Sequence, residues 1–153
     1  MIGGIELGGT KCVLAVANNP LDIIEKKVVS TRDPNSTISE IVSFFSNFKI
    51  SRLGVGSFGP LVLNSASSDY GLLVTESKKG WKGTNLVKEF SKINEDIVID
   101  TDVNAAALGE YHYGAGKGSE TFVYVTVGTG IGVGVLLKGE PHVGNFHLEI
   151  GHM

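Results

Sequence analysis

The sequence is poor in the residues that mark disulfide-stapled or strongly charged proteins. Cys12 is the only cysteine, which excludes an intrachain disulfide, and its place in an apolar run favours a buried thiol. Charged residues make up 19%, and the formal net charge is −3. The chain therefore lacks the basic field that would draw it to phosphate backbones or anionic lipid. We expect neither nucleic acid nor a membrane as a partner.

Long apolar runs are also missing. None approaches the roughly 20 residues that span a bilayer, and the opening Met1-Ile2-Gly3-Gly4 lacks the basic start and apolar core of a signal peptide. We therefore expect a cytoplasmic protein. Hydrophobic residues make up 42% of the chain, which predicts a packed globule because their burial offsets the ordering entropy of folding.

Glycine is in excess, with 21 of 153 residues, against roughly 7% in average proteins. These glycines are clustered between runs rich in valine and isoleucine, which a low-complexity linker would lack. Clustered glycine permits positive φ angles and a close approach of the backbone to a ligand. The clusters are therefore the first places to search for a site.

Hydrophobic periodicity predicts an α/β protein that starts with antiparallel strands. Thr37 and Glu40 have the spacing of a capping box ahead of apolar residues at helical spacing, and further helices are expected over 84–93 and 103–113. Strands are predicted over 2–7, 12–17, 23–30, 53–56, 97–100, 122–127 and 131–137.

The glycine-rich segment 114–119 is interpreted as a hinge between two lobes. We expect residues 1–117 to form a first lobe and residues 118–153 to begin a second, truncated one. The hairpins around 8–11 and 128–130 are similar units, which indicates an internal repeat. Because two strands cannot bury a face alone, the second hairpin is expected to pack on the first lobe or on a neighbouring chain.

Two glycine-threonine loops are candidate phosphate sites. In Gly8-Gly9-Thr10, backbone N–H groups and a hydroxyl can converge on an anion, although an ordinary hairpin turn would also accept two glycines. Gly128-Thr129-Gly130 continues with glycine at alternate positions, and a glycine-rich bulge is its alternative. Two such loops favour a nucleotide whose phosphates lie between two lobes.

Residues 54–59 match the G-x-G-x-x-G pattern of dinucleotide sites. That pattern should open a helix, yet Pro60 follows and the next residues show no helical periodicity. We therefore interpret this stretch as a ligand-facing loop. No Walker A pattern occurs in the sequence.

Asp102 follows a predicted strand and precedes a predicted helix. It can serve as a simple N-cap, the commonest use of such an Asp, or as a general base that accepts a proton from a sugar hydroxyl. Asn104, in the first turn, can cap the helix or bind a polar substrate. His142, His147 and His152 do not have the spacing of a helix-borne zinc pair, so the residues alone do not favour metal binding.

Six motifs resemble those of the ROK family of sugar kinases, in the same order and over essentially the whole chain. Ser57-Phe58-Gly59-Pro60, Glu6 and Lys78-Lys79-Gly80-Trp81 are most similar to the fructokinase branch, although Ser77 stands where that branch usually has proline. The six motifs are residues 4–11, 54–60, 80–81, 101–110, 128–132 and 149–152.

The resemblance implies an α/β protein with the actin-like ATPase (ribonuclease H-like) fold, in which a mixed sheet carries crossover helices. It implies ATP-dependent phosphorylation of a hexose, most simply fructose to fructose 6-phosphate, with Mg²⁺, in a cytoplasmic homodimer when full length. The isolated fragment is expected to be inactive. A non-catalytic, sugar-binding or sugar-sensing regulator of the same family is the alternative.

The resemblance also assigns roles to residues of this chain. Asp102 matches the catalytic base, and His152 matches a ligand of a structural Zn²⁺ whose other ligands, a cysteine cluster, are absent here. Sugar binding is expected from Asn104, Glu149 and His152. The phosphate loops are expected to be Gly8, Gly9, Thr10 and Lys11 together with Gly128, Thr129 and Gly130.

Overall fold

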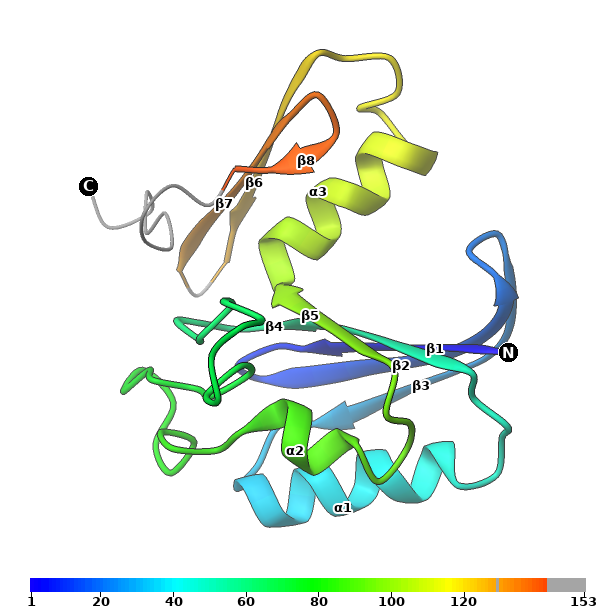
Figure 1. Ribbon diagram of the computed structural model, residues 1–153, viewed down its shortest axis with the longest axis vertical. Helices are drawn as coiled ribbons and strands as arrows, with labels where there is room; N and C mark the ends of the chain where they lie inside the picture. The colour runs from blue at the N-terminus through cyan, green and yellow to red at the C-terminus, as the bar shows by residue number, and fades with distance from the viewer. Residues whose placement is uncertain (129, 143–153) are drawn as a thin grey trace. The chain divides into compact units, whose positions relative to one another are not determined.

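The computed structural model describes residues 1–128 and 130–142 (Figure 1). The chain divides into two compact units, Met1–Asp100 and Thr101–Met153. The lobe boundary that the sequence places at residue 117 stays a prediction. None of the helices in the described ranges is both long and apolar enough to cross a membrane.

A mixed sheet of five strands, all within the fully described stretch 1–101, is the centre of the first unit. Its order is β3-β2-β1-β4-β5, with β1, β2 and β3 antiparallel and β4 parallel to β1. The carboxyl ends of β1, β3 and β4 therefore lie at one edge. The strands are β1 (Ile2–Leu7), β2 (Lys11–Asn19), β3 (Asp22–Ser30), β4 (Arg52–Ser57) and β5 (Ile97–Thr101).

Helices α1 (Pro34–Phe45) and α2 (Leu86–Phe90) cover one face of this sheet (Figure 1). Alternate residues of the strands point toward these two helices, and the buried side chains of strands and helices form one apolar core. All predicted strands of this unit are present. The largest fully buried side chains of this core are those of Trp81, Phe45, Phe90, Leu7 and Leu14.

The first helix begins earlier than the sequence predicted. Asp33, not Thr37, is the N-cap of α1, and its side chain accepts the N–H of Ser36 at 3.0 Å. Pro34 occupies the first turn, where its missing N–H costs nothing and its φ suits the helix. The predicted capping box of Thr37 and Glu40 is therefore wrong.

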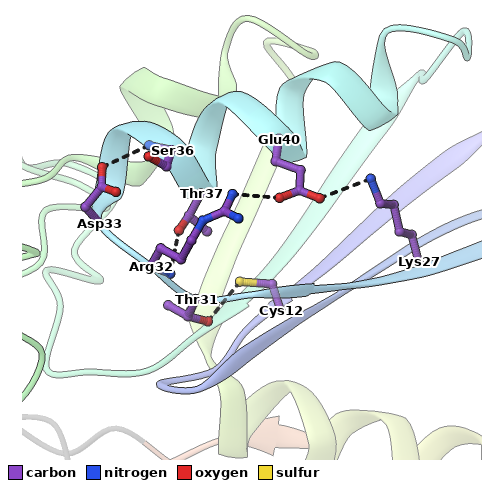
Figure 2. Close-up of polar contacts among 8 residues, drawn as sticks. All are labelled: Cys12, Lys27, Thr31, Arg32, Asp33, Ser36, Thr37 and Glu40. Carbon is purple, nitrogen blue, oxygen red and sulfur yellow. Dashed lines mark hydrogen bonds and ion pairs between the residues drawn. The ribbon is translucent and has the colours of Figure 1, made fainter.

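Thr37 and Glu40 have other partners in the structure (Figure 2). The hydroxyl of Thr37, fully buried, accepts the N–H of Arg32 at 2.9 Å. Glu40 pairs with Lys27 at 3.2 Å and with Arg32 at 2.8 Å. The hydrogen bond from Lys27, together with Arg32, holds the pKa of Glu40 below its ordinary value. These contacts attach α1 to β3 and to the segment that follows it.

No helix begins between β4 and α2, a stretch that the structure describes throughout. Residues 54–59 therefore lie on β4 and the loop after it, and the peptide bond between Gly59 and Pro60 is cis. A dinucleotide site needs a helix N-terminus at this place for the pyrophosphate. The prediction that no helix opens at this motif is confirmed.

The second unit pairs a helix with a β-hairpin. Its elements are α3 (Asp102–Tyr113), β6 (Thr121–Val127), β7 (Ile131–Leu137) and β8 (Glu140–Pro141). A Cβ on Gly134 would lie 2.5 Å from the carbonyl oxygen of Val103, and one on Gly132 would lie 2.6 Å from a Val103 methyl carbon. Glycine at alternate positions of β7 is thus required for packing against α3. This spacing, which the sequence analysis counted toward a phosphate site, has a structural cause.

The opposite face of the hairpin is apolar and exposed. Register pairs Val125 with Val133 and Val127 with Ile131, so these side chains share one face. That this face packs on the first lobe or on a neighbouring chain stays a prediction. The exposed apolar residues of the two strands are Val123, Val125, Val127, Ile131 and Leu137.

The cap of α1 should make folding sensitive to acid. The N–H of Ser36 holds the pKa of Asp33 below its ordinary value of 3.8. Because the folded-state pKa is the lower one, this stabilisation is present above pH 3.8 and is lost as the pH falls through the folded value. We expect Asp33→Ala to lower the Tm at pH 7, and the difference from the wild type to shrink below pH 3.8.

Asp33→Asn is the matched control, because asparagine caps a helix nearly as well and does not titrate. It should keep a Tm close to that of the wild type at pH 7, measured by circular dichroism. Equal Tm values for the wild type and Asp33→Ala at pH 7 would contradict this role of Asp33.

Candidate functional site

The loop between β1 and β2 is a tight turn at the edge where parallel strands end. The N–H of Gly8 donates to the carbonyl of Lys11 at 3.1 Å. A Cβ on Gly8 would lie 2.7 Å from that same carbonyl oxygen, whereas a Cβ on Gly9 would meet no atom within 4 Å. Gly8 is therefore required by the turn, and Gly9 borders open space.

Three successive carbonyls of this loop accept hydrogen bonds from the body of the first unit. Thr31 donates its hydroxyl to the Gly8 oxygen at 2.6 Å and its N–H to the Thr10 oxygen at 2.9 Å. The ammonium of Lys78 donates to the Gly9 oxygen at 2.6 Å. All three peptide oxygens are thus turned toward the protein.

The orientation of these carbonyls fixes the orientation of the amides. In a planar trans peptide the N–H points away from the C=O, so the N–H groups of Gly9 and Thr10 face away from Thr31 and Lys78. Among the described residues, neither N–H has an acceptor. Outward amides beside a glycine, which has no Cβ, offer accessible donors to an anion such as a phosphate.

The hydroxyl of Thr31 also contacts a buried thiol (Figure 2). Cys12 is fully buried and its sulfur lies 3.2 Å from the Thr31 hydroxyl oxygen. Because the only hydroxyl hydrogen of Thr31 goes to Gly8, the thiol must donate to Thr31. Burial raises the pKa of Cys12, which keeps the thiol protonated. The buried, structural thiol predicted from the sequence is confirmed.

Residues 75–81 approach the same edge of the sheet from elsewhere in the chain. Ser77 donates its N–H to the buried hydroxyl of Thr75 at 3.1 Å, which closes a local turn. Trp81 is fully buried, donates its indole N–H to the Arg32 carbonyl at 2.9 Å and packs edge-to-face on Phe58. The segment is thereby fixed to the residues that follow β3 and β4.

Asp102 is the first residue of α3 in the second unit. The N-cap is Thr101, whose hydroxyl accepts the N–H of Asn104 at 3.2 Å, so the interpretation of Asp102 as the cap is wrong. Asp102 accepts the N–H of Val103 at 2.9 Å, and Asn104 is buried. A negative charge in the first turn of a helix interacts favourably with the helix dipole.

The remaining candidate residues divide between described and undescribed parts of the chain. Gly128 and Gly130 are described, and a Cβ on either would meet no atom within 4 Å. Thr129, Glu149 and His152 lie outside the described residues. Within the described ranges, no group of three or more His, Cys, Asp or Glu side chains could hold a metal ion.

Thr31, Thr75 and Lys78 are contributors to this edge that the sequence analysis did not single out. Lys78 lies 69 positions from its partner Gly9, and Thr31 lies 23 positions from Gly8. Spacing in the sequence carries no signal for such contacts. Only the resemblance had drawn attention to the Lys-Lys-Gly-Trp segment, and it gave Lys78 no role.

The comparison with known sequences decides the family. The profile of the ROK family matches residues 2–153. The chain belongs to the ROK family. A fructokinase of Lactococcus lactis subsp. cremoris is 44% identical over 109 residues, with 71% of this chain and 38% of that protein covered. A putative fructokinase of Bacillus subtilis is 41% identical over 156 residues, with coverage of 100% and 52%. The ROK chain thus spans about half the length of the curated relatives it matches.

Solved structures show the fold. A putative N-acetylmannosamine kinase from Listeria monocytogenes has a TM-score of 0.83 at 25% identity, with 99% of the ROK chain and 53% of that protein covered. A ROK glucokinase from Streptomyces griseus, in complex with glucose and AMPPNP, gives 0.81 at 23% identity and covers 97% and 48%. The actin-like ATPase fold expected from the sequence is confirmed.

The same fold also serves a regulator. A ROK transcriptional regulator, a homologue of the E. coli MLC protein, gives a TM-score of 0.75 at 15% identity, with 95% of this chain and 39% of that protein covered. Fold alone therefore does not separate a kinase from a regulator, and function has to be argued from the site.

Trp81 should be essential for the stability of the site. Trp81→Phe keeps an aromatic ring against Phe58 but removes the donor to the Arg32 carbonyl. We expect a loss of about 1–3 kcal/mol in the free energy of unfolding, because a shielded acceptor loses its partner. Urea titration followed by circular dichroism measures it.

Tyr70→Phe is the control, since it also removes one polar group from an aromatic ring. The Tyr70 hydroxyl lies 3.5 Å from the Ile99 carbonyl and 3.3 Å from the Ile99 nitrogen, so its bonds are weaker. An equal or larger loss in Tyr70→Phe would contradict the role given to the indole N–H.

Proposed function

We propose that this chain carries the phosphate loop and the general base of an ATP-dependent hexose kinase, with fructose as the acceptor and fructose 6-phosphate as the product. The observation that carries the proposal is the loop after β1. Thr31 and Lys78 hold its carbonyls, and the N–H groups of Gly9 and Thr10 face outward beside open space. The names of the relatives, fructokinases at 41–44% identity, support the choice of sugar.

The phosphates of ATP would be held by residues 8–11 and by residues 128–130. Backbone N–H groups suit phosphate oxygens because they supply donors without a negative charge, and the exposed side chain of Lys11 adds a cation. Mg²⁺, which neutralises charge on the transferring phosphate, would come bound to the nucleotide. The described residues do not fit a structural zinc site, and we derive no step through that metal.

Asp102 would act on the acceptor. In this proposal its carboxylate takes the proton from a sugar hydroxyl, whose oxygen forms a bond to the γ-phosphorus as the bond from that phosphorus to the bridging oxygen of ADP breaks. Thr101 supplies the cap of α3, so the structure does not need the Asp102 carboxylate for that purpose. Asn104, Glu149 and His152 would bind the sugar.

The proposal is tested on the complete product of the gene that encodes this sequence. ATP-dependent phosphorylation of fructose, glucose and mannose is measured in parallel, and the highest kcat/KM is expected for fructose. Absence of turnover with all three, together with retained sugar binding, would favour the alternative of a sugar-sensing regulator. The cytoplasmic homodimer and the inactivity of the isolated 153-residue chain are further parts of this proposal.

Gly8 and Gly9 give a matched pair of variants. Gly9→Ala adds a methyl group where no protein atom lies within 4 Å, so folding should be unaffected while the space for a phosphate is reduced. Gly8→Ala places its Cβ 2.7 Å from the Lys11 carbonyl oxygen and should destabilise the turn itself.

We therefore expect Gly9→Ala to raise the KM for ATP with an unchanged Tm, and Gly8→Ala to lower the Tm. Nucleotide binding by calorimetry and thermal unfolding are measured on both variants. A Gly9→Ala protein with wild-type affinity for ATP would argue against a phosphate at this loop.

Asp102→Asn tests the general base. The amide keeps the shape of the side chain but has no basic oxygen, so kcat should fall about 10²- to 10⁴-fold, the usual contribution of a positioned base. The Tm should change little. If Asp102 only held the sugar, KM would rise and kcat would be retained.

Thr101→Ala is the control for an effect on the helix. It removes the cap and should cost about 1 kcal/mol of stability while kcat falls much less than in Asp102→Asn. A kcat of Asp102→Asn within a few fold of the wild type would end the assignment of Asp102 as the base.

A further inference from the structure

The ammonium of Lys78 binds backbone carbonyls rather than a carboxylate. Its half-buried side chain donates to two backbone oxygens, that of Gly9 at 2.6 Å and that of Thr31 at 3.2 Å. None of the ion pairs in the described ranges includes it. The ammonium thus holds two neutral backbone carbonyls rather than a carboxylate, which points to a role in positioning the backbone.

The peptide that Lys78 holds can adopt two orientations. The plane between Gly9 and Thr10 flips by rotation about its two flanking bonds, and the glycine on its amino side removes the steric barrier at one of them. A flipped plane would direct the Thr10 N–H inward and the oxygen outward. An outward oxygen would repel a phosphate, so the loop needs an external contact that selects one of the two orientations.

Thr31 cannot supply that contact. Its two donors are already used by the oxygens of Gly8 and Thr10, on either side of the flippable plane. Lys78 donates to the oxygen between them and, in addition, to the carbonyl of Thr31 itself. It therefore connects the loop to the residue that holds its two ends.

We propose that Lys78 is a positioning residue that locks the Gly9–Thr10 peptide with its N–H toward the phosphate of the nucleotide. The inference rests on the proposed function, and it gives residues 75–81 a role in nucleotide binding. The oxygens of Gly9 and Thr31 use two of the three N–H donors of the Lys78 ammonium, so a direct role as a phosphate ligand would rest on the third.

The test compares Lys78→Met with Lys79→Met in the isotope-labelled 153-residue chain. Both variants remove one positive charge, but Lys79 is exposed and has no hydrogen bond or ion pair among the described residues. Without ligand, Lys78→Met should shift the Gly9 carbonyl-carbon and Thr10 amide resonances, and Lys79→Met should leave them in place. Trp81, the only tryptophan, is the control for folding, and its emission should be unchanged in both.

Pyrophosphate is then titrated into the wild type and both variants. We expect about tenfold weaker binding in Lys78→Met, the loss of one hydrogen bond to a charged group, and little change in Lys79→Met. Lys78→Arg, which keeps a charged donor, should restore much of the affinity. If Lys78→Met does not fold, the comparison of Lys78→Arg with the neutral, shorter Lys78→Gln replaces it.

The outcomes separate the inference from the function on which it rests. Unchanged resonances of Gly9 and Thr10 in Lys78→Met would overturn the positioning role, and if affinity fell nevertheless, Lys78 would be a direct phosphate ligand. If the wild type bound no pyrophosphate at these amides, the assignment of this loop as a phosphate site would be wrong. The spectra without ligand would still decide whether Lys78 holds the loop.

Discussion

The hydrogen bonds of Thr31 to the turn between β1 and β2 are the contact on which the rest of the site depends. β1 and β3 run in the same direction with β2 between them, so the residue after β3 arrives beside the turn after β1. Thr31 can then bind the turn through both its hydroxyl and its N–H. The meander thus places a polar side chain where a flexible loop needs support.

Burial makes this support rigid. The Cys12 thiol lies under Thr31, and Trp81 fixes the next residue, Arg32, through its carbonyl. Both side chains are fully buried, so water cannot compete for these bonds. The geometry of Thr31 and Arg32 is therefore set by buried side chains of the hydrophobic core.

The sheet could be predicted from the sequence because its cause is local. Runs of β-forming residues between turn signals located every strand of the first unit to within two residues at either end. Helix starts were less predictable, because Thr37 has the identity of a cap but is fully buried by the packing of α1. The N-caps are Asp33 in α1 and Thr101 in α3. Thr101 and Asp102 are both suitable N-cap residues, and which of them caps α3 depends on the direction of the side chain.

The glycines show why a site cannot be read from residue type alone. Gly8, Gly9 and Gly134 look alike in the sequence, yet Gly8 avoids a carbonyl of its own turn and Gly134 avoids the backbone of α3. Of these three, only Gly9 would carry a Cβ with no atom within 4 Å. Such a glycine is not required by an intramolecular contact, and its missing side chain leaves room for a ligand.

Ser77 shows the opposite case, a departure from the family pattern that the structure compensates. Proline, which the resemblance to the fructokinase branch led us to expect at this position, restricts the backbone through its ring. Here the Ser77 N–H, which proline lacks, donates to Thr75, and the two hydroxyls lie 2.7 Å apart. Thr75 is buried, so the turn is fixed from the core. Lys78 follows directly, and its position at the loop between β1 and β2 therefore does not require the proline.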